Sequence, residues 1–180
     1  MKLVSIFVLV GLLALPTGAW AVGVLTPNAG DATFMASERA SESPAAVMVN
    51  SSTVFTITGG PIQILELLSV CITANDATAS TMQWQSVPTV GTATTITGAT
   101  ATLASATAGT SVLVQPTALS TAPVIVAAAS GGLHLGLVAQ NHIIVKDGTL
   151  KLVIGTGSTT GTWKHYLRYK PLSPSSTVTP

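Results

Sequence analysis

Hydrophobic and polar residues alternate along much of this chain with the two-residue period of a β-strand. The alternation is clearest over residues 163–170, just before a stop at Pro171. The apolar face that we expect to be buried comprises Trp163, His165, Leu167 and Tyr169. The opposite face comprises Lys164, Tyr166, Arg168 and Lys170. Because side chains of a strand point alternately to its two sides, this pattern predicts a half-buried strand.

Further strands are predicted where β-branched and aromatic residues recur between turn residues. The expected ranges are 53–58, 62–73, 81–86, 111–115, 123–128, 142–146 and 149–154, with short edge strands within 89–110. We find no convincing amphipathic helix, and about ten short strands are typical of two packed sheets or a closed one. The sequence therefore predicts an all-β fold, an antiparallel β-sandwich or jelly roll.

In the long apolar stretch at residues 62–73, the apolar residues do not all fall on one face of the predicted strand. Its even-numbered positions are apolar except for Glu66, yet Leu65 and Leu67 fall on the other face. Either both faces are covered or a β-bulge near Glu66 shifts the register. We favour the bulge over a functional buried carboxylate.

A turn signal lies between the predicted strands 142–146 and 149–154. Asp147-Gly148 is the residue pair preferred by a two-residue type I′ hairpin. The sequence therefore predicts that these two strands are antiparallel neighbours.

The N-terminal residues predict processing rather than structure. In residues 1–21, Lys2 precedes an apolar run that ends in small residues, as in a secretory signal peptide. The run is shorter than the about 20 residues of a membrane span, so we expect no stable span in the mature chain. Residues 22–52 are expected to form an extended arm, 53–174 the β-sandwich domain and 175–180 a flexible tail. Since all strong strand signals lie in 53–174, that part is expected to fold without the arm.

Composition restricts the chemistry that this chain can perform. Between Ala77 and Val145 there is no Asp, Glu, Lys or Arg, so we expect no enzyme, catalytic residue or cofactor. A net charge of +1 gives no field that would attract nucleic acid. Cys71 is the single cysteine, which we expect to be buried, and the histidines lack metal-ligand spacing: His134, His142 and His165. We expect His165 to be a hydrogen-bonded residue of the inner face.

The basic face of the last strand is the candidate interface, comprising Lys164, Tyr166, Arg168 and Lys170. Lys146 and Lys151 could join it in one cationic patch. We interpret the basic residues as a guard against edge-to-edge aggregation or as a contact with an acidic neighbouring subunit, in preference to nucleic-acid binding. Tyr166 is the aromatic residue that we expect to be free.

Two short motifs resemble small structural proteins of tailed-bacteriophage virions. They are FTITGGP at residues 55–61 and a tryptophan followed by LRYKPLSP at residues 163–174. The resemblance implies a non-enzymatic component of the particle, a head-surface decoration or an appendage, that assembles as a homo-oligomer and contacts other virion proteins. The N-terminal signal departs from that pattern, because virion proteins normally lack one.

Two other functions remain open on the residues alone. An exported bacterial surface or filament subunit could use the arm to add a strand to its neighbour. A secreted carbohydrate-binding module would need an exposed aromatic platform. The expected location is accordingly the virion, or the cell exterior if the signal is used.

Overall fold

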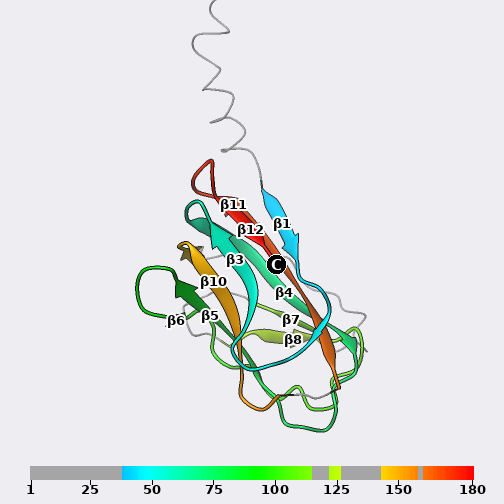
Figure 1. Ribbon diagram of the computed structural model, residues 1–180. Coiled ribbons are helices and arrows are strands. Elements are labelled where there is room, and N and C mark those ends of the chain that lie inside the picture. The colour runs from blue at the N-terminus through cyan, green and yellow to red at the C-terminus, as the bar shows by residue number, and fades with distance from the viewer. Residues whose placement is uncertain (1–37, 115–121, 127–142, 158–159) are drawn as a thin grey trace, which may run out of the picture. The chain divides into compact units, whose positions relative to one another are not determined.

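The computed structural model describes residues 38–114, 122–126, 143–157 and 160–180 (Figure 1). Every regular element within these residues is a β-strand. The strands are β1 (Arg39–Glu42), β2 (Ala46–Val47), β3 (Ser52–Thr58), β4 (Ile62–Thr73), β5 (Met82–Pro88), β6 (Thr94–Thr95), β7 (Ser111–Leu113), β8 (Val124–Val126), β9 (Ile143–Val145), β10 (Gly148–Ile154), β11 (Thr162–Pro171) and β12 (Thr177–Thr179). The predicted all-β class is confirmed. The signal peptide predicted at 1–21 lies outside the described residues.

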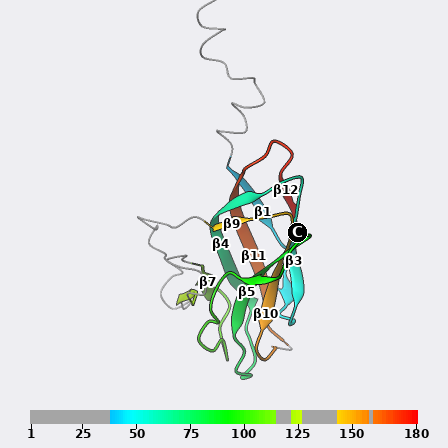
Figure 2. The ribbon, with the colours of Figure 1, turned by 90° about the vertical axis from the view of Figure 1, so that its left-hand side faces the viewer.

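The described strands form two antiparallel sheets. The seven-stranded sheet A has the order β1-β11-β4-β7-β8, with β2 also paired to β11 and β9 to β4, and the five-stranded sheet B has the order β12-β3-β10-β5-β6. Their inner faces are in contact, since the rings of Trp84 in β5 and His165 in β11 lie 5.3 Å apart between centroids. Figure 2 shows β4, β7 and β11 beside β3, β5 and β10. The chain is thus an antiparallel β-sandwich, and the more specific jelly roll stays a prediction.

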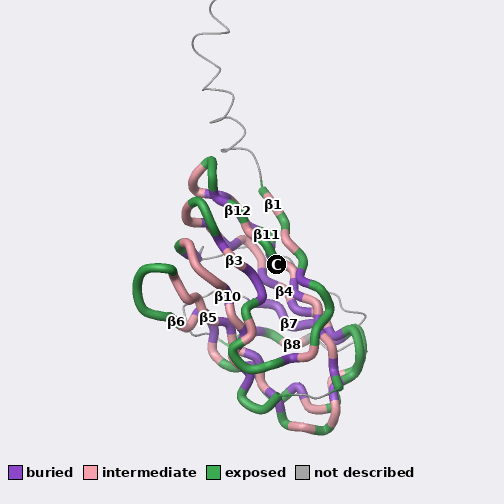
Figure 3. Tube along the Cα trace, viewed as in Figure 1, coloured by how far each residue is buried: buried purple, intermediate pink, exposed green. Residues whose placement is uncertain are grey.

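The buried hydrophobic residues form one core cluster. Figure 3 shows buried and half-buried positions along the strands that carry it. Its largest fully buried side chains come from both sheets: Trp84, Trp163, Phe55, Met48, Ile57, Ile62, Leu67, Met82, Leu103, Leu150, Leu152 and Leu167. In β11 every second residue from Trp163 to Tyr169 is buried, whereas the residues between them are half-buried or exposed. The register predicted for this strand is confirmed.

The bulge predicted in β4 is present. Ile64 pairs with Tyr169 and Glu66 with Arg168, so Leu65 has no residue opposite it on β11. Before the bulge the buried positions of β4 are even-numbered, and after Leu67 they are odd-numbered. The side chain of Glu66, 41% exposed, lies on the outer face beside Arg168. The extra residue thus explains why an acid falls within an apolar run.

The hairpin predicted at Asp147-Gly148 is wrong. β9 pairs with β4 in sheet A, and β10 pairs with β3 and β5 in sheet B. Both edges of β10 are therefore occupied, and the two residues form a corner where the chain passes between sheets. Gly148 has φ +145°, and a Cβ there would collide with the backbone of Val87 and Pro88. The residue pair provides the sharp change of direction, while the core decides which strands pair.

Asp147 ties three loops together at this corner. Its carbonyl oxygen accepts a hydrogen bond from Thr89 N at 2.8 Å, and its Oδ1 accepts one from Gly60 N at 2.8 Å. Thr89 begins the β5–β6 loop and Gly60 lies in the β3–β4 turn. The backbone carbonyl and the side chain of one residue, Asp147, therefore link these loops at one end of the sandwich.

The segment expected to be an arm contributes strands to sheet A. β1 and β2 pair along β11, opposite the edge that β11 shares with β4. The expected flexible tail also differs, because β12 pairs with β3 at the edge of sheet B. The guanidinium of Arg39 donates to the carbonyl of Ser176 at 2.9 Å and so joins the two segments. The compact unit accordingly runs from Ser37 to Pro180.

His165 and Cys71 are buried titratable residues of sheet A. His165 Nδ1 and Ser69 Oγ are 2.9 Å apart, and burial lowers the pKa of His165 to about 4. Cys71 Sγ donates to Thr73 O, and burial raises the pKa of its thiol. Both residues are buried as predicted, and His165 has a hydrogen-bond partner on the inner face.

The first prediction concerns the domain boundary. A fragment of residues 53–174 lacks β1, β2 and β12, which leaves a β11 edge unpaired next to the core. Exposed strand edges pair with other chains, so we expect this fragment to aggregate, whereas residues 38–180 fold cooperatively. Circular dichroism, thermal unfolding and light scattering of both fragments check this. A monomeric 53–174 fragment with an equal melting temperature would show that the outer strands are dispensable.

The second prediction concerns acid stability. Because the folded-state pKa of His165 is about 4 and that of an unfolded histidine about 6.5, the unfolded chain binds the proton more tightly. The free energy of unfolding is therefore unaffected by His165 above pH 6.5 and decreases as the pH drops towards 4. At about 1.4 kcal/mol per pKa unit, the loss amounts to about 3 kcal/mol. Urea unfolding at several pH values measures this loss. His165→Gln, which does not titrate there, should lose less stability over the same range, and an equal loss in both proteins would exclude His165 as the source.

Candidate interaction face on sheet A

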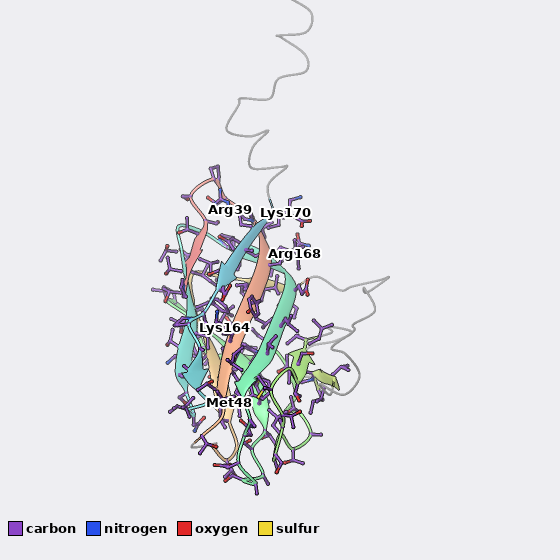
Figure 4. The ribbon with its side chains drawn as sticks, turned by 90° about the vertical axis from the view of Figure 1, so that its right-hand side faces the viewer. Arg39, Met48, Lys164, Arg168 and Lys170 are labelled. Atoms are coloured by element: carbon purple, nitrogen blue, oxygen red, sulfur yellow. The ribbon has the colours of Figure 1, made fainter. Side chains whose placement is uncertain are left out.

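The predicted interface residues lie together on the outer face of β11, where Figure 4 labels Lys164, Arg168 and Lys170. β1 and β4 flank this strand. Opposite Tyr166 lie Glu42 on one side and Leu68 on the other. We call the surface around Tyr166 the interaction face; it comprises Glu38, Glu42, Glu66, Leu68, Lys164, Tyr166 and Arg168.

Ion pairs across the strands neutralise the basic residues of this face. Lys164 Nζ contacts the Glu42 carboxylate, and this hydrogen bond raises the pKa of Lys164. The Arg168 guanidinium lies 3.8 Å from Glu38 Oε2 and 3.7 Å from Glu66 Oε2. Such exposed pairs contribute little to stability, because solvent screens the charges. Their main effect is to give the face a mixed charge pattern.

The broader cationic patch is not assembled. Lys151 lies in β10 of sheet B, where it pairs with Gln85, so its side chain belongs to the other sheet. Lys146 follows β9 at the corner beside Asp147 and does not line the hollow around Tyr166. The sequence predicted both lysines in a hairpin next to β11. Because that hairpin does not form, the two lysines do not join the basic residues of β11.

A shallow groove of about 480 Å³ runs across the interaction face. It is lined by Ala40, Ser41, Glu42, Glu66, Leu68, Tyr166, Leu167 and Arg168. Tyr166 is half-buried, whereas the aromatic rings of Trp84, Trp163 and Tyr169 are buried. Part of the Tyr166 side chain is therefore accessible, although it is not fully free. We call this hollow the Tyr166 groove.

The free edges of both sheets are short or interrupted. In the described part of the chain, the outermost strands β8, β12 and β6 have three, three and two residues. On the β1–β2 edge, Glu42 pairs with Tyr166 and Ala46 with Trp163, so three residues face two on β11. Pro44 lies within this bulge, and Ser43 Oγ accepts from His165 N at 3.0 Å. Short strands, bulges and proline all hinder strand addition.

The described residues offer few groups for metal or membrane binding. Among residues 38–114, 122–126, 143–157 and 160–180, no group of three His, Cys, Asp or Glu side chains is placed to hold a metal ion. His134 and His142 lie outside these ranges. The described residues likewise include no helix with the length and apolar character needed to cross a membrane. Comparison of the chain with protein-family models, curated proteins and solved structures finds no match.

Sequence reasoning missed the acidic half of the interaction face. Glu38 and Glu42 were assigned to an unpaired arm, yet β1 brings both beside β11. One signal could have found them, because Glu38 and Glu42 have the same four-residue spacing as Lys164 and Arg168. Two antiparallel strands with this spacing bring opposite charges together.

The third prediction separates core anchors from surface charges. Trp163 is fully buried, and its Nε1 donates to Asn75 Oδ1 at 3.0 Å. Trp163→Ala should therefore lower the free energy of unfolding by about 3–5 kcal/mol. The Lys164→Ala, Arg168→Ala double variant should leave the free energy of unfolding nearly unchanged, because solvent screens these charges. Urea denaturation midpoints compare them, and a double variant more damaged than Trp163→Ala would contradict the assigned faces.

Proposed function

We propose that this chain is a non-enzymatic structural subunit that acts through contacts with neighbouring subunits, as a decoration or appendage protein of a tailed-bacteriophage particle. The Tyr166 groove carries the proposal. It combines an aromatic ring, an aliphatic floor and an arginine held between carboxylates. Tyr and Arg are enriched in protein interfaces. Its ionisable groups are paired in open solvent, which suits recognition better than proton transfer.

The sheet edges favour this proposal over assembly by strand addition. An exported filament subunit of that kind needs a long, regular edge that can pair with another chain. Pro44 and the bulge interrupt the β1–β2 edge, and Glu38 and Glu42 add charge beside it. We therefore place the contacts on sheet faces and loops. The signal-like N-terminus remains the observation that favours an exported surface protein.

A carbohydrate-binding function finds less support. Sugar platforms present several aromatic rings to solvent, and among the described residues Tyr166 is the aromatic ring that a groove exposes. The rings of Trp84, Trp163 and Tyr169 are buried in the core.

The fourth prediction tests where the protein is found. A culture that expresses the gene is separated into density-banded particles, cell envelope, cytosol and medium, and an antibody and mass spectrometry follow the chain. We expect it to band with the particles at a fixed ratio to their major proteins. Recovery in envelope filaments would support the exported alternative instead, and recovery as free protein in the cytosol would contradict both.

A matched pair of variants ties this location to the interaction face. Tyr166→Ala combined with Arg168→Glu should fold normally and leave the particle fraction. Lys151→Glu, on the outer face of sheet B, should stay in it. If both variants keep the wild-type distribution, the interaction face is not the contact.

A further inference from the structure

A hollow of about 290 Å³ enters the core between the edges of the two sheets. On sheet A it is bounded by side chains of residues 43–49, which include β2. On sheet B it is bounded by the start of β3, where β12 does not pair, and by β10. We call it the His165 slot, after the residue of β11 that lines it. Its aliphatic lining residues are Pro44, Ala46, Val47, Val49, Val54 and Leu152.

His165 presents an unpartnered ring nitrogen to this slot. The hydrogen bonds of His165 to the described residues are made by its backbone and by Nδ1, which lies 2.9 Å from Ser69 Oγ. In the same part of the chain, the side-chain atoms that lack both a partner and solvent contact are Ser80 Oγ and Trp84 Nε1. His165 Nε2 is not one of them, although the residue is only 5% exposed. This nitrogen therefore faces the slot that its residue lines.

The surroundings of Ser69 decide which ring nitrogen carries the proton. Ser69 is 0% exposed, and His165 Nδ1 is the partner of its hydroxyl among the described residues. If Nδ1–H donated to Ser69 Oγ, the hydroxyl hydrogen would be buried without an acceptor, which is costly. The hydroxyl is satisfied when it donates to Nδ1, and the neutral imidazole then carries its proton on Nε2. Burial keeps the ring neutral near pH 7, because it lowers the pKa of His165 to about 4.

The lining of the slot suits an uncharged ligand. No Asp, Glu, Lys or Arg side chain is among the described residues that line it. A charged molecule would lose its hydration there without gaining an ion pair with a side chain. The aliphatic walls suit a hydrocarbon chain, and the Nε2–H donor requires an acceptor oxygen on that chain. Because a cavity of about 150 Å³ accommodates benzene, about 290 Å³ is enough for a short chain with one polar head.

We infer that the His165 slot binds a small uncharged aliphatic ketone or ester, whose carbonyl oxygen accepts a hydrogen bond from His165 Nε2. The inference goes beyond the proposed function, since the slot and the Tyr166 groove are different surfaces. His165 lies on the inner face of β11, whereas Tyr166 lies on the outer face. A ligand in the slot contacts both sheets and binds the folded chain alone, so it raises the melting temperature in a concentration-dependent way.

NMR of the purified full-length chain with isotope-labelled histidine tests the site directly. The signal of His165 is the one that is missing from the spectrum of His165→Gln. In the free protein it should show a neutral ring with the proton on Nε2. The probe is methyl hexanoate, an ester with a short aliphatic chain. It should shift the Nε2–H signal in a saturable way and raise the melting temperature, whereas the charged hexanoate ion should do neither.

A matched pair of alanine variants locates the bound ester. Ala46 and Ala45 are both exposed neighbours, but Ala46 lines the slot and Ala45 does not. Ala46→Trp should weaken binding of methyl hexanoate by roughly tenfold or more, because the indole fills space that the chain of the ester needs. Ala45→Trp should bind like the wild type.

A third variant tests the hydrogen bond itself. His165→Phe keeps a ring in place but removes the donor, so it should weaken binding by about three- to tenfold, as expected for one hydrogen bond. If this buried substitution prevents folding, the alanine pair still decides the question.

Four results would overturn the inference. They are a His165 ring protonated on Nδ1, an Nε2–H signal that methyl hexanoate leaves unchanged up to its solubility limit, equal binding by Ala46→Trp and Ala45→Trp, and equal binding of the ester and the hexanoate ion. The second of these results would mean that the slot holds water only.

Discussion

The pairing of β4 with β11 is the constraint on which the rest of this structure depends. The two strands run side by side from Ile62 to Thr73 and from Pro171 back to Thr162, and they align the core residues of sheet A. β1 and β2 pair on the far side of β11, while β7 and β9 share the other edge of β4. Because of the bulge at Leu65, the buried positions of β4 change from even-numbered to odd-numbered residues while β4 stays paired with β11. It also turns Glu66 outward, where the carboxylate meets Arg168. The same irregularity therefore shapes both the core and the interaction face.

The spacing of apolar residues along the chain predicted those parts of the fold in which the buried side of a strand follows that spacing. The limits of β4, the two faces of β11 and the bulge near Glu66 all follow from the spacing of apolar residues. Pairing partners do not follow from it. Asp147-Gly148 suits a tight change of direction equally well in a hairpin and in a corner between sheets, and the occupied edges of β10 decide between them. β1, with the sequence Arg-Ala-Ser-Glu, carries no strand signal of its own, and its conformation comes from the edge of β11.

The interaction face was half predictable for the same reason. Lys164, Tyr166, Arg168 and Lys170 lie on one face of one strand, so their grouping is a local property. The carboxylates that pair with Lys164 and Arg168 come from β1, from Glu38 directly before it and from β4, far away in sequence. A surface formed by residues of several strands cannot be predicted from the periodicity of any one strand.

Asp147 also bears on how relatives of this chain can vary. Its two hydrogen bonds join the β3–β4 turn, the β5–β6 loop and the β9–β10 corner, three segments separated by long stretches of sequence. An insertion or deletion in one of these segments would move a donor away from an acceptor that the other two hold in place. The three loops should therefore evolve as one unit, with conserved lengths and correlated substitutions, even where the strands between them drift freely.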